Sequence, residues 1–150
     1  MTRFEHSVVI QRPVEEVWAY VVETANNPAW QGPIVEVSRP AGMPLEVGAE
    51  IPEVASFLGK RFRISLAVSE LEPMTRSAVR TSAGPVRLDG SYRFEPAEGG
   101  TRFTMAGEVD AHGFFSVAEP VFAAVTRRES ASSCERLKQL LEAEVTTDSP

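Results

Sequence analysis

The first thirty residues change from the spacing of a strand to the spacing of a helix. In FEHSVVIQ, residues 4–11, every second side chain faces one side, which is typical of a half-buried strand. From Val14 to Val22, apolar residues recur three and four positions apart, which predicts an amphipathic helix. Pro13 suits the first helical position, and the Asn-Asn-Pro sequence at 26–28 predicts that the helix ends near Thr24.

The middle of the chain, from Ile34 to about Ala111, follows the two-residue period of β-strands. Six segments show this period, most of them separated by short turns: residues 34–38, 47–57, 60–73, 75–82, 86–96 and 101–111. Connections this short predict an antiparallel meander. Pro52 is expected to place the second of these strands at a sheet edge or in a bulge, because proline cannot donate to a ladder.

The last segment predicts one long helix. It begins either with a capping box at Ser116 and Glu119 or at Pro120 itself, and it runs to about Glu144. Both ends are apolar, whereas the middle, TRRESASSCER at 126–136, is polar and rich in small residues. A polar centre is unusual for a helix that covers an apolar sheet, and either a cavity or an exposed face explains it. The tail at 145–150 is expected to fray.

These elements predict an α+β fold in one domain that spans residues 1–150. The strands have one apolar face, and the long helix is the element that can cover it. A chain of 150 residues is the usual size of a single domain with its own core. Gly90 and Gly107 permit the sheet to curve, and a curved sheet around a helix leaves room for a cavity.

Composition narrows the choice of partners and compartment. A net charge of −6 argues against sequence-independent binding to nucleic acid, which requires basic surface. The single cysteine, Cys134, permits no disulfide within the chain, and no apolar run approaches the roughly 20 residues that span a bilayer. The N-terminus shows no signal peptide. We therefore expect a soluble cytoplasmic protein, monomeric or homodimeric, with no nucleic-acid partner and no membrane insertion.

The motifs of several common chemistries are missing from the sequence. It contains neither a phosphate-binding loop nor a dinucleotide fingerprint, and it has no nucleophile elbow. Two histidines and one cysteine, widely spaced, do not form a zinc site. We expect no metal and no cofactor.

A few polar residues at inward positions could carry chemistry. His6 could orient a ligand or act as a base, and Tyr92 could bond a ligand oxygen, although both residue types also occur as hydrogen-bonded core groups. Glu53 shares a strand face with apolar residues, and Glu50 replaces it there if Pro52 introduces a bulge. In the last helix, Thr126, Glu129 and Ser133 could line a cavity or lie on an exposed face. Thr126 and Glu129 are the two that we select as candidates.

Apolar side chains on the predicted inner faces form the second group of candidates. Taken singly, such residues are more simply explained as core, but a pocket for a small molecule is also mostly apolar, and as a set they are candidates for its lining. The candidates are Trp30, Phe57, Phe62, Ile64, Phe103, Met105, Phe115 and Phe122.

Several segments together resemble the START-like (SRPBCC) superfamily, in its polyketide cyclase/dehydrase branch. They are FEHSVVIQRPVEEVWAYVVETANNPAW at the start, VGAEIP, ELEP, YRFEP followed by GGTRFT, and RLKQLLEAE near the end. The resemblance covers essentially the whole chain. It implies a helix-grip fold, in which a curved antiparallel sheet of about seven strands wraps around the C-terminal helix and a deep pocket lies between them. It also implies two short helices that form a V, with Trp18 in the core and Trp30 near the pocket wall.

Three functions follow from this resemblance. The first is binding of a small, largely apolar ligand such as a lipid, an isoprenoid or an aromatic polyketide-like molecule. The second is catalysis as a polyketide cyclase, aromatase or dehydratase, with His6, Glu53 or Tyr92 as the proton-transfer group. The third is a partner-binding protein with a vestigial pocket, which an apolar patch on the outer sheet face would favour.

Overall fold

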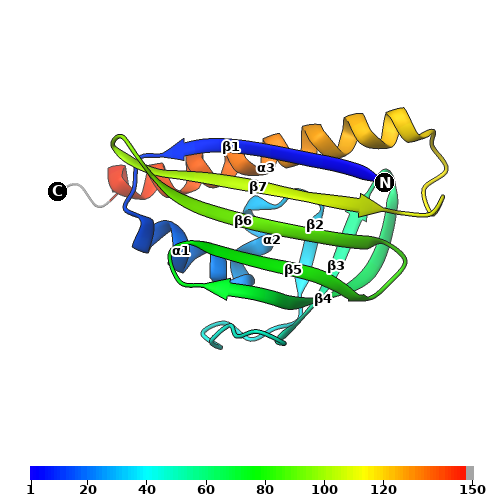
Figure 1. Cartoon of the computed structure of the whole chain (residues 1–150), viewed down its shortest axis with the longest axis horizontal. Coiled ribbons are helices and arrows are strands. Elements are labelled where there is room, and N and C mark those ends of the chain that lie inside the picture. Colours follow the sequence, from blue (N-terminus) through cyan, green and yellow to red (C-terminus); the bar gives the residue numbers. More distant parts are fainter. Residues whose placement is uncertain (148–150) are drawn as a thin grey trace.

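The computed structural model describes residues 1–147 of the chain, and Figure 1 shows their arrangement. In chain order, the elements are β1 (Thr2–Ile10), α1 (Val14–Val22), a 3-10 turn (Thr24–Asn26), α2 (Asn27–Trp30), β2 (Ile34–Val37), β3 (Glu50–Phe57), β4 (Lys60–Glu72), β5 (Arg76–Ala83), β6 (Arg87–Ala97), β7 (Gly100–Asp110) and α3 (Glu119–Thr147). The predicted strands and helices all occur. α3 begins with Pro120 in its first turn and continues past the expected end at Glu144. The last three residues of the tail lie outside the described residues.

The strands form one antiparallel sheet in the order β1-β7-β6-β5-β4-β3-β2. β3 to β7 are joined as a meander. The last strand of the meander, β7, pairs with the first strand of the chain, β1, which forms one edge of the sheet. In Figure 1 the sheet curves across the molecule, α3 runs behind β1 and β7, and α1 and α2 lie behind the sheet at one end. This is the helix-grip arrangement that the resemblance implies, and the α+β prediction is confirmed.

β3 lies inside the sheet and not at its edge, so the expectation from Pro52 is wrong. The edge strand is β2, and the pairing of β3 with β4 runs without a bulge from Glu50 to Phe57. Pro52 is tolerated because β2 has already ended at Val37, which pairs with Glu53. The carbonyl of Pro52 faces the β2 side, where it accepts from the backbone N–H of Ser38. The nitrogen of the same residue points to the same side, so the hydrogen bond that proline cannot donate is missing where β2 ends and not in the ladder with β4. Glu53 consequently points inward and Glu50 outward.

Two clusters of buried side chains form the core. The first lies beneath α1, α2 and the C-terminal half of α3, where Trp18 packs edge-on against Phe94 with ring centroids 5.1 Å apart. This confirms that Trp18 is a core residue. The second cluster lies under the middle of the sheet and includes Ile64, Leu66 and residues of the segment that precedes α3. Among the described residues, buried members of the second cluster border the cavity between the sheet and α3, whereas the first cluster reaches it through Met105, which packs against it.

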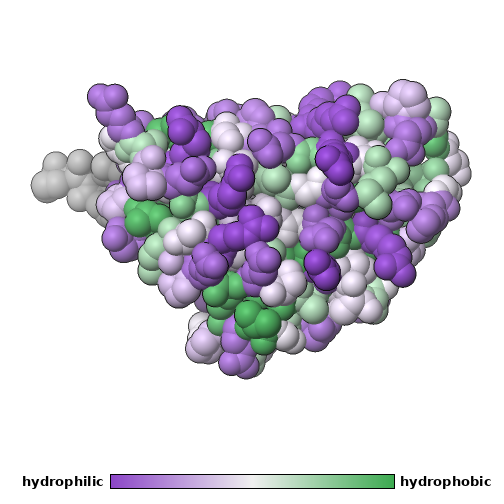
Figure 2. Space-filling model, viewed as in Figure 1, coloured by the Kyte–Doolittle hydropathy of each residue, from purple (hydrophilic) through white to green (hydrophobic). Residues whose placement is uncertain are grey.

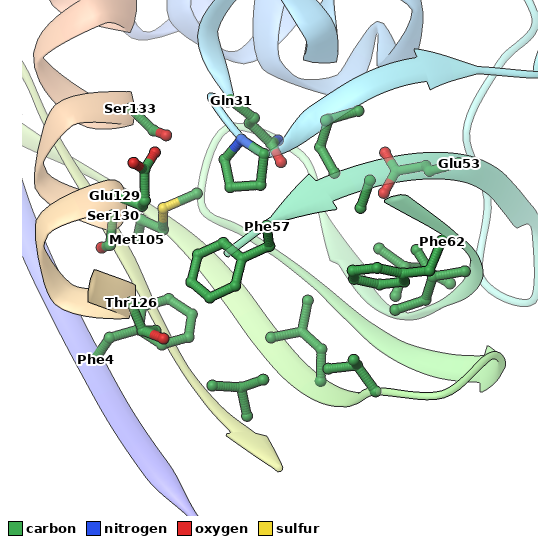
Figure 3. Close-up of a pocket in the computed structure, with 18 of the residues that line it drawn as sticks. Phe4, Gln31, Glu53, Phe57, Phe62, Met105, Thr126, Glu129, Ser130 and Ser133 are labelled. Atoms are coloured by element: carbon green, nitrogen blue, oxygen red, sulfur yellow. The ribbon is translucent and has the colours of Figure 1, made fainter. Parts of the chain in front are cut away.

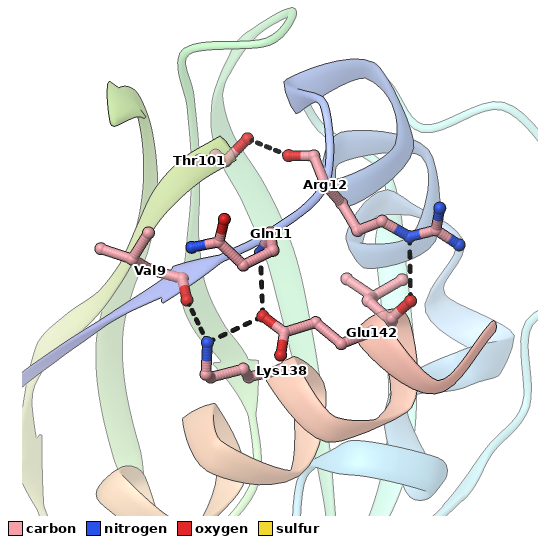
Figure 4. Close-up of polar contacts among 7 residues, drawn as sticks. Val9, Gln11, Arg12, Thr101, Lys138 and Glu142 are labelled. Atoms are coloured by element: carbon pink, nitrogen blue, oxygen red, sulfur yellow. Dashed lines mark hydrogen bonds and ion pairs between the residues drawn. The ribbon is translucent and has the colours of Figure 1, made fainter. Parts of the chain in front are cut away.

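Polar contacts attach the C-terminal half of α3 to the end of β1 (Figure 4). The ammonium group of Lys138 donates to the carbonyl of Val9 and to the carboxylate of Glu142. That carboxylate also accepts from the backbone N–H of Gln11 at 2.8 Å, and Arg12 donates from Nε to a backbone carbonyl of α3 at 2.9 Å. These contacts hold one half of the helix against the sheet. The other half extends over the second core cluster and the cavity.

The outer face of the sheet is mostly polar (Figure 2). Apolar side chains gather at the lower edge of that view, over the loop between β2 and β3, where Met43 and Val47 are more than half exposed at 52% and 63%. Within residues 1–147, no helix is long and apolar enough to cross a membrane.

Candidate functional site

A cavity of about 170 Å³ lies between the concave face of the sheet and the N-terminal half of α3 (Figure 3). One water molecule needs roughly 10–15 Å³ of such volume, so this cavity has room for several waters or for a small organic molecule. The lining residues are Phe4, Gln31, Pro33, Ile34, Glu53, Ala55, Phe57, Phe62, Ile64, Leu66, Val86, Leu88, Met105, Val109, Phe115, Phe122, Thr126, Glu129, Ser130 and Ser133.

Aromatic rings surround one end of the cavity. Phe57 of β3 contacts both Phe115 and Phe122 edge-on, with centroids 5.4 and 5.8 Å apart, and so joins the sheet to α3. Phe115 belongs to the segment between β7 and α3, and its neighbour Phe114 packs against Phe62. The ammonium group of Lys60 donates to the carbonyl of Phe114 at 2.6 Å and lies over its ring. The segment before α3 therefore closes this end through ring contacts and one cationic contact.

Glu53 places a carboxyl group in the cavity wall formed by β3. Its side chain is 4% exposed, and its Oε2 accepts from the side-chain amide of Asn27 at 3.0 Å. Burial raises the pKa of Glu53 from 4.5 to about 7, and the Asn27 hydrogen bond opposes the rise only in part. Within the described part of the chain, no other donor bonds this carboxyl. Glu53 can therefore hold or release a proton near neutral pH.

The polar middle of α3 forms the facing wall. Thr126, Glu129, Ser130 and Ser133 recur at three- and four-residue spacing, which places all four on one side of the helix. Ser133 accepts from the backbone N–H of Gly32 at 3.2 Å. The hydroxyl oxygens of Thr126 and Ser130 are buried and have no hydrogen-bond partner among the described residues. The cavity explanation of the polar segment therefore applies to these four positions.

Most of the sequence candidates line the cavity. They are Glu53, Phe57, Phe62, Ile64, Met105, Phe115, Phe122, Thr126 and Glu129. His6, Trp30, Tyr92 and Phe103 do not line it. His6 is half-buried on the inner side of β1 and borders a separate surface hollow beside Arg127.

Trp30, Tyr92 and Phe103 form an aromatic group behind the cavity. Trp30 and Phe103 are fully buried, and their ring centroids lie 5.8 Å apart. The hydroxyl of Tyr92 accepts from the side-chain amide of Gln31 at 2.8 Å, and Gln31 in turn lines the cavity. Burial, with the nearby carboxyl of Glu53, raises the pKa of Tyr92, so its phenol stays neutral. Tyr92 therefore lies behind the cavity wall, next to the lining residues Gln31 and Glu53.

Several lining residues were not among the sequence candidates. Phe4, Leu88 and Val109 alternate with polar neighbours along their strands, and this two-residue period could have added them. Ser130 follows from the helical spacing of Thr126 and Ser133. Gln31 carries no such signal, because its position depends on where the short α2 ends.

Comparison with protein families identifies the family of this chain. A family model described as polyketide cyclase / dehydrase and lipid transport matches residues 1–142. The chain belongs to this family. The match confirms the resemblance that the sequence segments carry. None of the curated proteins matches the chain in sequence.

Solved structures share the family fold at low sequence identity. The protein TTHA0849 from Thermus thermophilus is 16% identical with a TM-score of 0.77, over 95% of this chain and 98% of that one. The Zhui aromatase/cyclase from Streptomyces sp. R1128 is 18% identical with a TM-score of 0.72, over 95% and 94%. The di-domain ARO/CYC BexL from the BE-7585A biosynthetic pathway is 23% identical with a TM-score of 0.71, over 99% of this chain and 48% of that one. At these identities the likeness concerns the fold alone.

Proposed function

We propose that this protein binds a small, largely apolar ligand in the cavity between the sheet and α3. The observation that carries the proposal is the lining itself, which combines aromatic and aliphatic walls with a few polar groups on β3 and α3. Such a lining is typical of sites that hold small organic molecules. The unpaired hydroxyls of Thr126 and Ser130 support it, because buried polar groups usually have partners and a ligand can provide them.

The family supports a lipid, an isoprenoid or an aromatic polyketide-like ligand. Its description covers both polyketide cyclisation and lipid transport, and one structural neighbour is named an aromatase/cyclase. A planar aromatic ligand could pack edge-to-face or offset-stacked against the rings that line one end of the cavity, which are Phe57, Phe62, Phe115 and Phe122. We therefore use a bicyclic aromatic probe to represent the ligand.

The proposal is tested by titrating the protein with the uncharged dye N-phenyl-1-naphthylamine and following its fluorescence. We expect saturable binding, and we expect Ala55→Leu to weaken it by about tenfold, because the added carbons fill cavity space. Ala67→Leu on the outer face of β4 is the matched control and should bind the dye as the wild type does. Failure of the wild type to bind the dye would contradict the proposal.

A second candidate function is proton-transfer catalysis, and the position of Glu53 favours it. A general acid or base works best when its pKa lies near the working pH, and burial raises the pKa of Glu53 to about 7. Of the three groups that the sequence suggested, Glu53 lines the cavity whereas His6 and Tyr92 do not. We propose Glu53 as the proton-transfer group if a bound polyketide-like molecule is converted.

Substitution of Glu53 separates the two functions. If the protein is an enzyme, Glu53→Gln should abolish product formation from a polyketide-like substrate and leave dye affinity within a few-fold, since Gln keeps the shape of Glu. If the protein only binds its ligand, the wild type will release that ligand unchanged. The partner-binding function receives less support, because the outer sheet face in Figure 2 is mostly polar.

A further inference from the structure

The charges that line the cavity all have the same sign. Glu53 on β3 and Glu129 on α3 are its ionisable residues, and no Lys, Arg or His belongs to the described lining. Figure 3 shows the two carboxyl groups on facing sides of the cavity. A polar group of a bound ligand therefore meets a carboxyl group whether it turns toward β3 or toward α3.

Two basic side chains close to lining residues, Arg136 and Lys60, bind backbone carbonyls. Arg136 donates to the carbonyl of Trp30 at 3.0 Å, and Lys60 donates to the carbonyl of Phe114 at 2.6 Å. Within residues 1–147, neither Glu53 nor Glu129 forms an ion pair. A ligand anion in the cavity would therefore meet two carboxyl groups and no cationic side chain of the described lining.

The unsatisfied polar atoms of the walls can accept hydrogen bonds. Glu53 has a single donor, Asn27, although a carboxylate can accept several hydrogen bonds. Ser130 is 7% exposed, and its hydroxyl, like that of Thr126, has no hydrogen-bond partner within residues 1–147. Hydroxyl groups accept as well as donate, so an O–H or N–H group of a ligand finds acceptors on both walls.

We propose that the cavity selects apolar ligands whose polar group is a hydrogen-bond donor without negative charge, namely an alcohol, a phenol or an amine, and that it rejects carboxylates such as fatty-acid anions. This inference rests on the proposed function, since it presupposes an apolar ligand in this cavity. Its physical basis is that a charge inside a protein is screened weakly, so a like charge nearby strongly disfavours it.

The test compares four ligands with one naphthalene body: 2-methylnaphthalene, 2-naphthol, 2-naphthylmethylamine and 2-naphthoate. Each displaces N-phenyl-1-naphthylamine at about pH 8, where a carboxylic acid with an ordinary pKa of about 4 is ionised. We expect 2-naphthol and the amine to bind at least about tenfold more tightly than 2-naphthoate. Equal or tighter binding of 2-naphthoate would overturn this inference and leave the proposed function intact. Failure of all four ligands and the dye to bind would overturn the proposed function itself.

Substitutions of Glu53 and Glu129 test whether their carboxyl groups cause the discrimination against 2-naphthoate. Glu53→Gln and Glu129→Gln should each raise the affinity for 2-naphthoate several-fold while the affinity for 2-methylnaphthalene stays unchanged. Glu50→Gln is the matched control, because Glu50 lies on the opposite face of the same strand. If neither cavity variant improves 2-naphthoate binding, the charge-based selection is wrong.

The pH gives a further readout. Glu53 faces Asn27, the neutral phenol of Tyr92 on β6, and Ile64 of β4, with Glu129 across the cavity on α3. Lowering the pH from about 8 to about 6 should protonate Glu53 and improve 2-naphthoate binding in the wild type, while Glu53→Gln loses most of this gain. An equal gain in both proteins would contradict the role of Glu53.

Discussion

Replacement of Glu53 by Gln should change how the stability of the protein depends on pH. The carboxyl is 4% exposed, and its pKa rises from 4.5 to about 7 on folding because burial disfavours the charged form. At about 1.4 kcal/mol per pH unit, this rise corresponds to about 3 kcal/mol of folding free energy. The unfolded chain releases the proton first as the pH increases. The stabilisation is therefore complete below pH 4.5 and is lost as the pH rises to 7.

The assay is urea unfolding of the wild type and Glu53→Gln at several pH values. Between about pH 5 and about pH 8, the wild type should lose about 2.5 kcal/mol relative to the variant, which carries no titrating group at this position. In thermal unfolding this corresponds to a relative change in Tm of roughly 5–10 °C for a domain of this size. Gln can still accept the hydrogen bond of Asn27, so the comparison isolates the charge.

Glu50→Gln provides a control of opposite sign on the same strand. Hydrogen bonds from Ser82 and Ser65 lower the pKa of Glu50, so its contribution is present above the unfolded pKa and is lost as the pH falls. Parallel pH profiles for the wild type and Glu53→Gln would refute the reasoning. They would mean that water or a local rearrangement solvates the Glu53 carboxylate.

Other positions give sharp predictions. Gly100→Ala should cost about 2–3 kcal/mol in urea unfolding, because its Cβ would clash with the backbone carbonyl oxygen of Ile10. Gly90→Ala, whose nearest contact would be 3.8 Å, should cost less than about 1 kcal/mol. Similar losses for both variants would contradict the close approach at Gly100. Trp30→Ala should cost about 3–5 kcal/mol, as deletion of a fully buried ring does, and a loss below about 1 kcal/mol would remove Trp30 from the core. Cys134 should not react with a thiol-specific disulfide reagent until the protein unfolds, because burial raises the pKa of its thiol to about 12; rapid reaction of the native protein would refute this.

The sequence predicts the fold well because its patterns are local and mutually consistent. Alternation along β4 places Ile64, Leu66 and Val68 in the core, as observed. The position of Pro52 misleads, because a proline inside a sheet is tolerated when the neighbouring strand has already ended, and the length of β2 is not encoded near Pro52. The inward direction of Glu53 still follows from the alternation alone.

The candidate site is harder to predict because facing inward does not distinguish a cavity wall from packed core. Phe103 and Tyr92 share the inner face with Met105 and Leu88, yet only the latter two line the cavity. The difference arises from α1 and α2, which cover one end of the sheet with Trp18 and fill the space there. Such long-range packing has no signature in the spacing of residues.

Chemical-shift mapping of methyl groups tests the central claim most directly, since it reports both whether a ligand binds and where. On titration with 2-naphthol, saturable shifts should concentrate on the methyl groups of Ala55, Ile64 and Met105, which line the cavity. Ala67 on the outer face of β4 should not shift. Shifts confined to outer-face residues, or no saturable shift at all, would contradict the account.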